Sequence, residues 1–320
     1  EGLRNAMRVG LQFVRQSSHL QGVLLRISLF FLHSTALLAL LPLVARGLKG
    51  GDAGTFTLLL AAMGMGAIIA ALSMQQVRRV IPHARLLLLG AALQSLGTLV
   101  VAWAPNVIIA APAMFVAGMA WITVANTLTV SAQMALPDWV RARGMSIYQM
   151  AIMGATAVGA ALWGQIATIS NIHWSMGIAA FTGLAAMVAA HRFMPAHNME
   201  EDLTPSRVFK VPTAEAPPRS GRIQVNIEYR IDPARADEFR ALMQESRRSR
   251  MRQGALAWEL LHDLYDPGRF IEQITDESWT EHLRRFDRVT ADDVALRDRK
   301  LAFHIADTPP VVMRSVIEAS

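Results

Sequence analysis

A single histidine stands out as a side chain that could move a proton in this sequence. His33 lies near the middle of a long apolar stretch, where an ionisable group is costly and usually faces a cavity or a partner. Histidine titrates near neutral pH, so His33 could carry a coupled proton. The alternative is that His33 only bonds to a neighbouring helix and helps it to pack.

Polar side chains are also frequent in a second apolar stretch, residues 107–136. Asn126 and Gln133 are seven residues apart, so they share one face of a helix. Thr123, and Gln149 at the start of the next stretch, are further polar side chains in this region. Hydrogen bonds between helices are one explanation for these side chains.

A short charged segment, residues 135–144, lies between two long runs without Asp, Glu, Lys or Arg. Pro137 and Asp138 are expected to end one helix, and Gly144 to let the next begin. The charged side chains of this segment, with two arginines from an earlier connection, could form a gate whose ion pairs break and re-form, or could only fix the orientation of the chain. These gate candidates are Asp138, Arg141, Arg143, Arg78 and Arg79.

In the last third of the chain, aromatic and histidine side chains could line a pocket. Trp279 and His282 are three residues apart and share a helix face, and Trp258 and His262 could join them. Core packing for the tryptophans and capping or surface positions for the histidines are the alternatives. No catalytic triad, metal cluster or phosphate loop stands out, and there is no cysteine, so no metal or cofactor is expected.

The elements that must position these residues fall into two classes. Only 9 charged residues occur between positions 27 and 191, but 34 occur between positions 222 and 320. This contrast predicts a membrane part followed by a soluble tail. The spans need roughly 20 apolar residues each, and the sequence predicts six of them, at about 23–45, 53–77, 86–103, 107–136, 145–169 and 173–193.

Basic residues alternate between the connections of these spans. Arg78, Arg79, Arg85, Arg141, Arg143 and Arg192 belong to one side, whereas the other side holds only Arg46 and Lys49. The positive-inside rule then places both ends of this segment in the cytoplasm. The basic excess is thus explained by the membrane, and no nucleic-acid partner is expected. Residues 1–22 are expected to form an amphipathic helix, either on the inner membrane face or as a linker.

Residues 196–221 are rich in proline and are expected to be a linker. Beyond it, residues 222–320 alternate between strand and helix patterns. We expect strands at 222–231, 257–263, 269–275 and 311–316, a helix at 235–252 and one or two short helices between 278 and 302. This β-α-β-β-α-β order is typical of a ferredoxin-like domain.

Three segments carry a family resemblance: Leu40–Arg46 (Leu-Leu-Pro-Leu-Val-Ala-Arg), Gln133–Arg143 and Leu162-Trp163-Gly164. On these, residues 1–195 resemble the C-terminal six-helix half of a major facilitator superfamily transporter, from the branch of transmembrane secretion effectors and enterobactin-exporter-like proteins. The superfamily loop motif is poorly kept at Ser73–Arg85, which lacks its Gly and Asp. The resemblance implies that an N-terminal half is missing before Glu1 and that spans one and four line a cavity between the halves.

The tail is similar to the dimeric α+β barrel superfamily that includes antibiotic-biosynthesis monooxygenases. The residues that carry this likeness are Asp266–Phe270 and Ser278–His282. It implies a homodimer through the tail, and the superfamily contains oxygenases that need no cofactor as well as members without known activity.

Taken together, the sequence indicates a multi-pass transporter of the bacterial inner (plasma) membrane, not an enzyme. Its expected partners are the lipid bilayer and, as the resemblance implies, a small organic substrate and protons. The resemblance also implies efflux by alternating access, along a path for which the candidates are His33, Thr123, Asn126, Gln133 and Gln149. Two alternatives stay open: a membrane-tethered, monooxygenase-like enzyme in the tail, and a tail that only dimerises or regulates.

Overall fold

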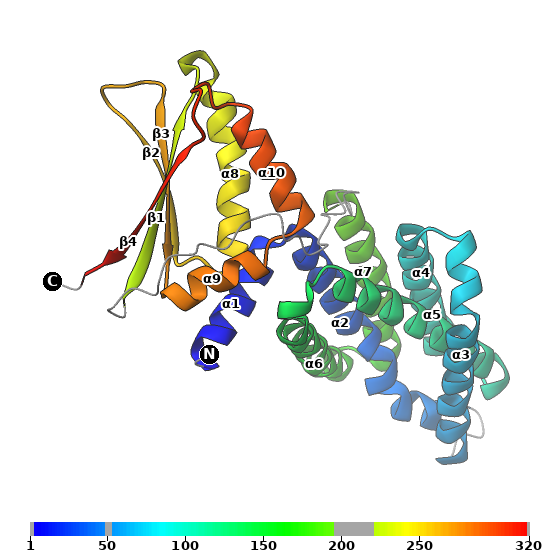
Figure 1. Cartoon of the computed structure of the whole chain (residues 1–320). Coiled ribbons are helices and arrows are strands. Elements are labelled where there is room, and N and C mark those ends of the chain that lie inside the picture. The colour runs from blue at the N-terminus through cyan, green and yellow to red at the C-terminus, as the bar shows by residue number, and fades with distance from the viewer. Residues whose placement is uncertain (1–2, 49–52, 195–220, 319–320) are drawn as a thin grey trace. The chain divides into compact units, whose positions relative to one another are not determined.

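The computed structural model describes residues 3–48, 53–194 and 221–318 (Figure 1). The chain divides into two compact units. The helical unit comprises His19–Ala135 and Met145–Asn198, and the tail unit comprises Glu1–Ser18, Leu136–Gly144 and Met199–Ser320. Lys49 and the expected linker at 196–220 lie outside the described residues.

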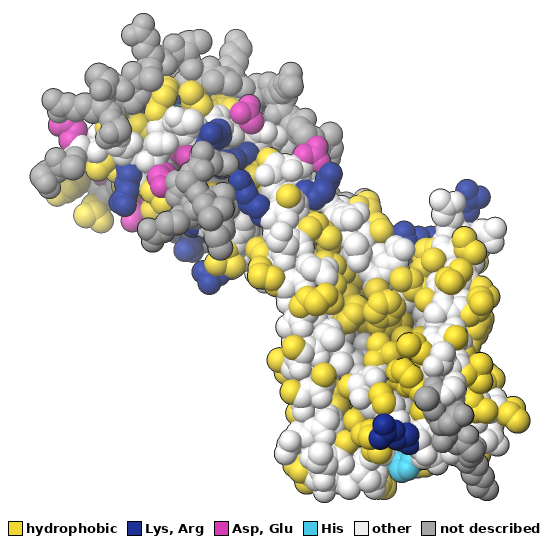
Figure 2. Space-filling view, turned by 90° about the horizontal axis from the view of Figure 1, so that it is seen from below, with side chains coloured by type: hydrophobic (Ala, Val, Ile, Leu, Met, Phe, Trp, Pro, Cys, Tyr) yellow, Lys and Arg dark blue, Asp and Glu magenta, His cyan; other side chains and the backbone are white. Residues whose placement is uncertain are grey.

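The prediction of six apolar membrane-crossing helices is confirmed. Each helix has at least 20 residues, which at about 1.5 Å per residue is enough to cross the roughly 30 Å hydrocarbon layer. Hydrophobic side chains are spread over the helical unit on the face seen in Figure 2, and few charged ones lie among them. The helices are α2 (Ser18–Gly47), α3 (Ala53–Val80), α4 (His83–Ala102), α5 (Val107–Met134), α6 (Asp138–Ile169) and α7 (Ile172–Phe193).

Helices α3 and α5 approach closely because glycines lie at their contact. A Cβ atom at Gly66 of α3 would collide with the carbonyl oxygen of Phe115, and one at Gly118 of α5 would collide with that of Met63. Each helix therefore places a glycine against the other's backbone. This is the packing by small residues that is common between helices in lipid.

Helices α2 and α7 are joined by a buried arginine. Arg26 donates hydrogen bonds from its Nη2 to the carbonyl oxygens of Ala190 and Met194, at the end of α7. Carbonyl groups at a helix end lack partners within the helix and carry partial negative charge, so a cation is favoured there. Arg26 thus neutralises the end of α7 while its stem is buried.

The charged segment after α5 differs from the prediction. Asp138 does not end a helix: it begins α6, and residues 138–143 form the first turns of that helix. An acidic residue in a first turn is favourable because the helix amino end is partially positive. The connection between α5 and α6 is therefore only Ala135–Pro137, and Gly144 lies inside α6, packed against Leu136.

The tail unit contains a four-stranded antiparallel sheet in the order β2-β3-β1-β4. The predicted strands and helices of the tail are present with small shifts at their ends. Among the described residues, the helices α8, α9 and α10 lie on one face of the sheet (Figure 1). The elements are β1 (Arg222–Arg230), a 3-10 turn (Pro233–Arg235), α8 (Ala236–Arg252), β2 (Ala257–His262), β3 (Arg269–Asp276), α9 (Trp279–Asp287), α10 (Ala291–Leu301) and β4 (Val311–Ile317).

The core of the tail lies between this face and α8. Tyr229 of β1 pairs with Phe270 of β3, and both pack against Phe239 and Met243 of α8. Local signals fix the helix starts: the side chain of Asp232 accepts from the amide of Ala234, and those of Ser278 and Thr290 accept at the starts of α9 and α10.

The first helix, α1 (Leu3–Gln16), also belongs to the tail unit and packs against α8. It buries Val9 and Phe13, whereas Leu11 is 44% exposed. The Nε2 amide of Gln12 donates to the Ala255 carbonyl at 2.8 Å. The buried face of α1 is thus turned toward the tail's helices, and the predicted amphipathic helix is present, whereas its role at the membrane or as a linker stays a prediction.

Candidate functional site

A small polar cavity lies within the helical unit, between α2, α4 and α7. Its volume is about 20 Å³, which is enough for about one water molecule. Its polar lining comes from two helices, and α7 closes it with small side chains around Gly183. The polar residues are His33, Ser34, Gln94, Ser95 and Thr98.

Two of these side chains have unmet hydrogen-bonding capacity. Both amide atoms of Gln94 are buried without a hydrogen-bond partner in the structure, and so is the hydroxyl of Ser34. A buried polar group without a partner costs roughly 1–3 kcal/mol, so a fold keeps few of them. The cavity therefore offers donors and acceptors to a molecule that enters it.

His33 lies at the edge of this cavity. Its Nδ1 is 2.7 Å from the carbonyl oxygen of Leu29, one turn earlier in α2, and its ring centroid is 5.6 Å from that of Trp163 in α6. The Trp163 indole donates to the Leu32 carbonyl at 2.7 Å, which fixes the aromatic ring beside the histidine. Because Nδ1 is engaged with the backbone, Nε2 is the nitrogen of His33 that could exchange a proton with a molecule in the cavity.

The other predicted path residues lie outside this cavity. Asn126 accepts a hydrogen bond of 2.8 Å from Arg78 of α3, and the Thr123 hydroxyl donates to its own helix at Met119. Gln133 and Gln149 are exposed. The structure thus joins Asn126 to a gate candidate and does not bring it together with His33.

The remaining gate candidates are distributed over both units. Within the tail unit, Arg141 and Asp138 form an exposed ion pair of 2.7 Å one turn apart. Arg143 of the same segment lies against Gly10 of α1. In the helical unit, Arg79 is exposed at the end of α3. The role of these residues as a gate stays a prediction.

A second and larger cavity, of about 230 Å³, lies in the tail unit between the helix-bearing face of the sheet and α8–α10. Its wall combines apolar side chains with an unusual number of cationic ones. The lining residues used below are Ile227, Phe286 and Val312, with Arg250, Arg285, Arg297, Lys300 and Arg314.

The inner end of this cavity is held by a buried carboxylate. Glu272 of β3 is fully buried and accepts from Ser246 and Trp258, at 2.7 and 2.9 Å, and from Lys300 at 3.1 Å. Burial by itself would raise the pKa of Glu272, but the charges of Lys300 and Arg250 hold that pKa well below its usual range. Burial also lowers the pKa of Lys300, to about 8.

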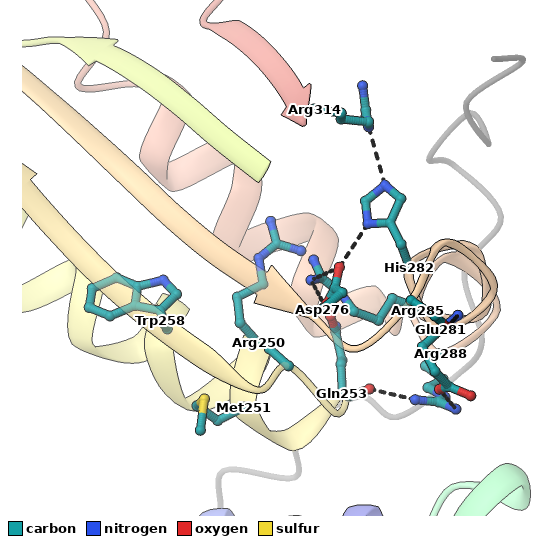
Figure 3. Close-up of polar contacts among 12 residues, drawn as sticks. Arg250, Met251, Gln253, Trp258, Asp276, Glu281, His282, Arg285, Arg288 and Arg314 are labelled. Atoms are coloured by element: carbon teal, nitrogen blue, oxygen red, sulfur yellow. Dashed lines mark hydrogen bonds and ion pairs between the residues drawn. The ribbon is translucent and has the colours of Figure 1, made fainter. Parts of the chain in front are cut away.

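The outer end is held by a chain of four side chains, drawn in Figure 3. Arg285 donates to both oxygens of Asp276 at 2.7 and 2.8 Å, and Nδ1 of His282 lies 2.8 Å from Asp276. Arg314 donates to Nε2 of His282 at 3.2 Å. Because arginine can only donate, Nε2 is the acceptor and the proton of the imidazole lies on Nδ1, toward Asp276.

Burial by itself would raise the pKa of Asp276, but the charge of Arg285 and the His282 hydrogen bond hold it below its ordinary value. Asp276 therefore stays ionised and orients both partners. The arrangement presents Arg314 at the cavity with its Nε already bonded.

Of the four predicted pocket residues, only His282 lines this cavity. Trp258 packs in the core, and its indole bonds Glu272. Trp279 packs on a neighbouring core cluster, with its ring 5.4 Å from that of His282. His262 stacks on Phe270 at 4.3 Å, away from the other three.

Sequence reasoning missed Gln94, Glu272, Asp276 and Arg314. Glu272 and Asp276 carried a usable signal, because in an alternating strand they fall on the same face as Phe270 and Ile274. Gln94 also carried one, as an amide within a long run without charged residues. Nothing in the pattern around Arg314 separates it from an ordinary surface arginine.

Six apolar helices long enough to cross a membrane define a multi-pass membrane protein. The chain belongs to the transmembrane secretion effector family of major facilitator transporters, whose model matches residues 1–320. A comparison with curated proteins found no match. Among solved structures, the chain is similar to one described as an antibiotic biosynthesis monooxygenase from Bordetella bronchiseptica, with 23% identity, a TM-score of 0.27, and coverage of 31% of this chain and 99% of that one.

Proposed function

We propose that this protein exports a small organic molecule in exchange for protons, by alternating access in a bacterial inner membrane. The observation that carries the proposal is the cavity at His33 and Gln94, a proton-binding group beside unsatisfied polar groups inside an apolar bundle. Protons cross apolar regions through such groups, because bare charge in hydrocarbon is costly.

We propose that the transporter is assembled from three parts. The helical unit is one half of a transporter, an N-terminal half completes the substrate cavity, and the tail is a ferredoxin-like domain that pairs with a second copy. Both ends of this segment are cytoplasmic, supported by the alternation of arginines between connections. Export is supported by the family's description as a secretion effector.

The test is a comparison of small molecules inside and outside cells with the full-length protein present or deleted. We expect one compound to accumulate inside the deletion strain and to disappear from the medium. Its export by the wild type should follow the proton gradient, and His33→Ala should remove that dependence. A compound that changes chemically, with unchanged partition, would contradict export and favour an enzyme.

A second candidate, a regulatory role of the tail, is favoured by contacts within the tail unit. Phe13 of α1 meets Trp139 of α6 edge-on at 5.7 Å, and Arg288 of the tail lies over the same indole. Helix α6 then continues without interruption to Ile169 as a membrane-crossing helix. A change in the tail would therefore act directly on the start of that helix.

A further inference from the structure

We propose that the tail cavity binds a small organic acid, with its carboxylate at Arg314 and its apolar body against Ile227, Phe286 and Val312. The inference does not rest on transport, because every residue it uses belongs to the tail. It concerns a binding site that the six-helix unit neither needs nor explains.

The wall of the tail cavity is strongly cationic. Five cationic side chains line it, and in the described part of the chain the carboxylates paired with them include Glu272, Asp276 and, at the surface, Asp298 beside Arg297. Asp293, which lies near Lys300, is engaged by Ser249, Gln253 and Thr290. Positive charge thus exceeds negative charge at the cavity, which favours an anion over a cation there.

Arg314 has a hydrogen bond at its Nε but no ion pair among the described residues. Its Nε donates to His282, and among the described residues no carboxylate lies within ion-pair distance of its guanidinium. Arg314 is exposed on the edge strand β4, and partial burial of its guanidinium lowers its pKa. A planar guanidinium with two terminal nitrogens available is suited to a carboxylate, which it can bind through two parallel hydrogen bonds.

The cavity wall also contains a buried polar atom. Arg285 is 7% exposed and lines the cavity, and its Nε has no hydrogen-bond partner in the structure although its Nη1 is held by Asp276. Unpartnered buried donors are rare in folded proteins. An anionic group entering the cavity would supply an acceptor in its neighbourhood.

The apolar wall sets the rest of the ligand. Ile227 and Val312 are register partners on β1 and β4, and Phe286 of α9 also lines the cavity. The volume of about 230 Å³ is just below the roughly 300–1,000 Å³ of common ligand sites, so the ligand is small. An aromatic or short aliphatic acid combines these requirements, whereas a cationic ligand would be repelled.

The test uses 2-naphthoate and its uncharged analogue 2-naphthalenemethanol as probes. Binding to the full chain in nanodiscs is measured by calorimetry, with empty nanodiscs as the blank. We expect naphthoate to bind at least about tenfold more tightly than the alcohol. Arg314→Gln should weaken naphthoate by at least about tenfold, because the charge-assisted pair of hydrogen bonds is lost. The same variant should leave alcohol binding unchanged.

Three further variants make the result specific. Arg314→Lys should keep part of the preference for the acid, and Val312→Trp should block both probes by filling the cavity. Arg247→Gln, which removes the same charge from an exposed position on α8, should change neither. If Arg314→Gln does not fold, judged by gel filtration, Arg297→Gln takes its place and should weaken naphthoate only.

Two outcomes would overturn the proposal. One is equal affinity for the acid and the alcohol, which would show that the cationic wall does not favour a negatively charged ligand. The other is an equal loss with Arg247→Gln and Arg314→Gln, which would reduce the preference to the general charge of the surface.

Discussion

The guanidinium of Arg288 lies 4.9 Å from the centre of the Trp139 ring, so the tail holds the first turn of α6 through a cation–aromatic contact. Arg288 is itself fixed, because it donates to the Gln253 carbonyl at 2.7 Å and pairs with Glu281 at 3.1 Å. The adjoining Gly254 has a φ of 107°, and a Cβ there would meet an Arg288 nitrogen. These contacts within the tail unit hold Arg288 in position against Trp139.

Replacing Trp139 by Ala should loosen α1 from the tail, because the indole is the shared partner of Phe13 and Arg288. A cation–aromatic contact of this kind contributes roughly 0.5–2 kcal/mol, so we expect hydrogen exchange in α1 to accelerate about threefold to thirtyfold. Mass spectrometry of exchanging peptides measures this. Trp174→Ala, at an exposed position of α7, is the control, and unchanged exchange in α1 would contradict the contact's role.

Glu272 should be the most sensitive charged position of the tail. Glu272→Gln leaves the buried Lys300 and the half-buried Arg250 without their carboxylate, and removing one partner of a buried ion pair costs roughly 3–5 kcal/mol. The double variant Glu272→Gln with Lys300→Met should recover part of this loss, because one uncompensated charge is removed as well. Urea unfolding followed by the ¹⁹F signal of fluorotryptophan at Trp258 measures both. A double variant as unstable as the sum of the singles would show that the two residues are not coupled.

The stability of the tail should depend on pH at both ends. The folded-state pKa values of Glu272 and Asp276 lie below their unfolded values of about 4.3 and 3.9, so their stabilisation is present above about pH 4.5 and is lost as the pH falls. Lys300 acts at the other end. Its pKa of about 8 is below the unfolded value of about 10.4, so between these values the unfolded state holds more protons and the Lys300 contribution to stability rises with pH.

The same urea unfolding, repeated from pH 3 to pH 10, measures both effects. Lys300→Met should remove the rise in unfolding free energy between pH 8 and pH 10. The loss of stability at low pH that comes from Asp276 should remain in this variant. A tail whose unfolding free energy falls between pH 8 and pH 10 in the wild type alone would contradict the assigned direction for Lys300.

The sequence predicts elements well where one local rule decides them. The six spans follow from the length of uncharged apolar runs, and the tail helices follow from caps such as Ser278. It fails where a distant segment decides. Val9 and Phe13 are four residues apart and so share a face of the expected helix, but the sequence does not say that the tail, rather than a membrane, covers that face.

The candidate sites show the same division. His33 is conspicuous as an ionisable residue among apolar ones, so sequence alone finds it. Gln94, which lines the same cavity, is visible in the sequence as an amide within an uncharged run, but only the packing of α4 against α7 shows that its polar atoms are buried without hydrogen bonds. Likewise, Asn126 has a polar amide that could line a path, yet its side-chain oxygen accepts a hydrogen bond from Arg78 of another helix.

A pair of glycines in α3 gives a matched test of helix packing. Gly66→Ala should destabilise the helical unit by roughly 1–3 kcal/mol, because the new methyl group collides with the Phe115 carbonyl. Gly64→Ala, one half-turn away with no atom within 4 Å, should be neutral or stabilising by up to about 1 kcal/mol, since alanine favours a helix. Thermal unfolding in nanodiscs compares them, and equal effects would contradict the close α3–α5 contact.

The final prediction separates stability from transport at the cavity of the helical unit. Gln94→Leu should leave stability unchanged or raise it by roughly 1–3 kcal/mol, because it removes a buried amide whose two polar atoms lack partners. The same change makes the cavity apolar, so proton-dependent export should fall while the protein stays folded. Gln76→Leu, at an exposed position near the end of α3, is the matched control and should change neither quantity.

Export assays in cells, paired with thermal unfolding of the purified protein, measure both quantities for Gln94→Leu. A loss of stability would mean that the amide of Gln94 has partners that stabilise the bundle, and the cavity would then serve packing. Unchanged proton-dependent export in a stable variant would remove the cavity from the proton path and leave His33 as a packing residue. The expected combination, a stable protein with weakened proton coupling, is one that neither packing nor a general defect produces.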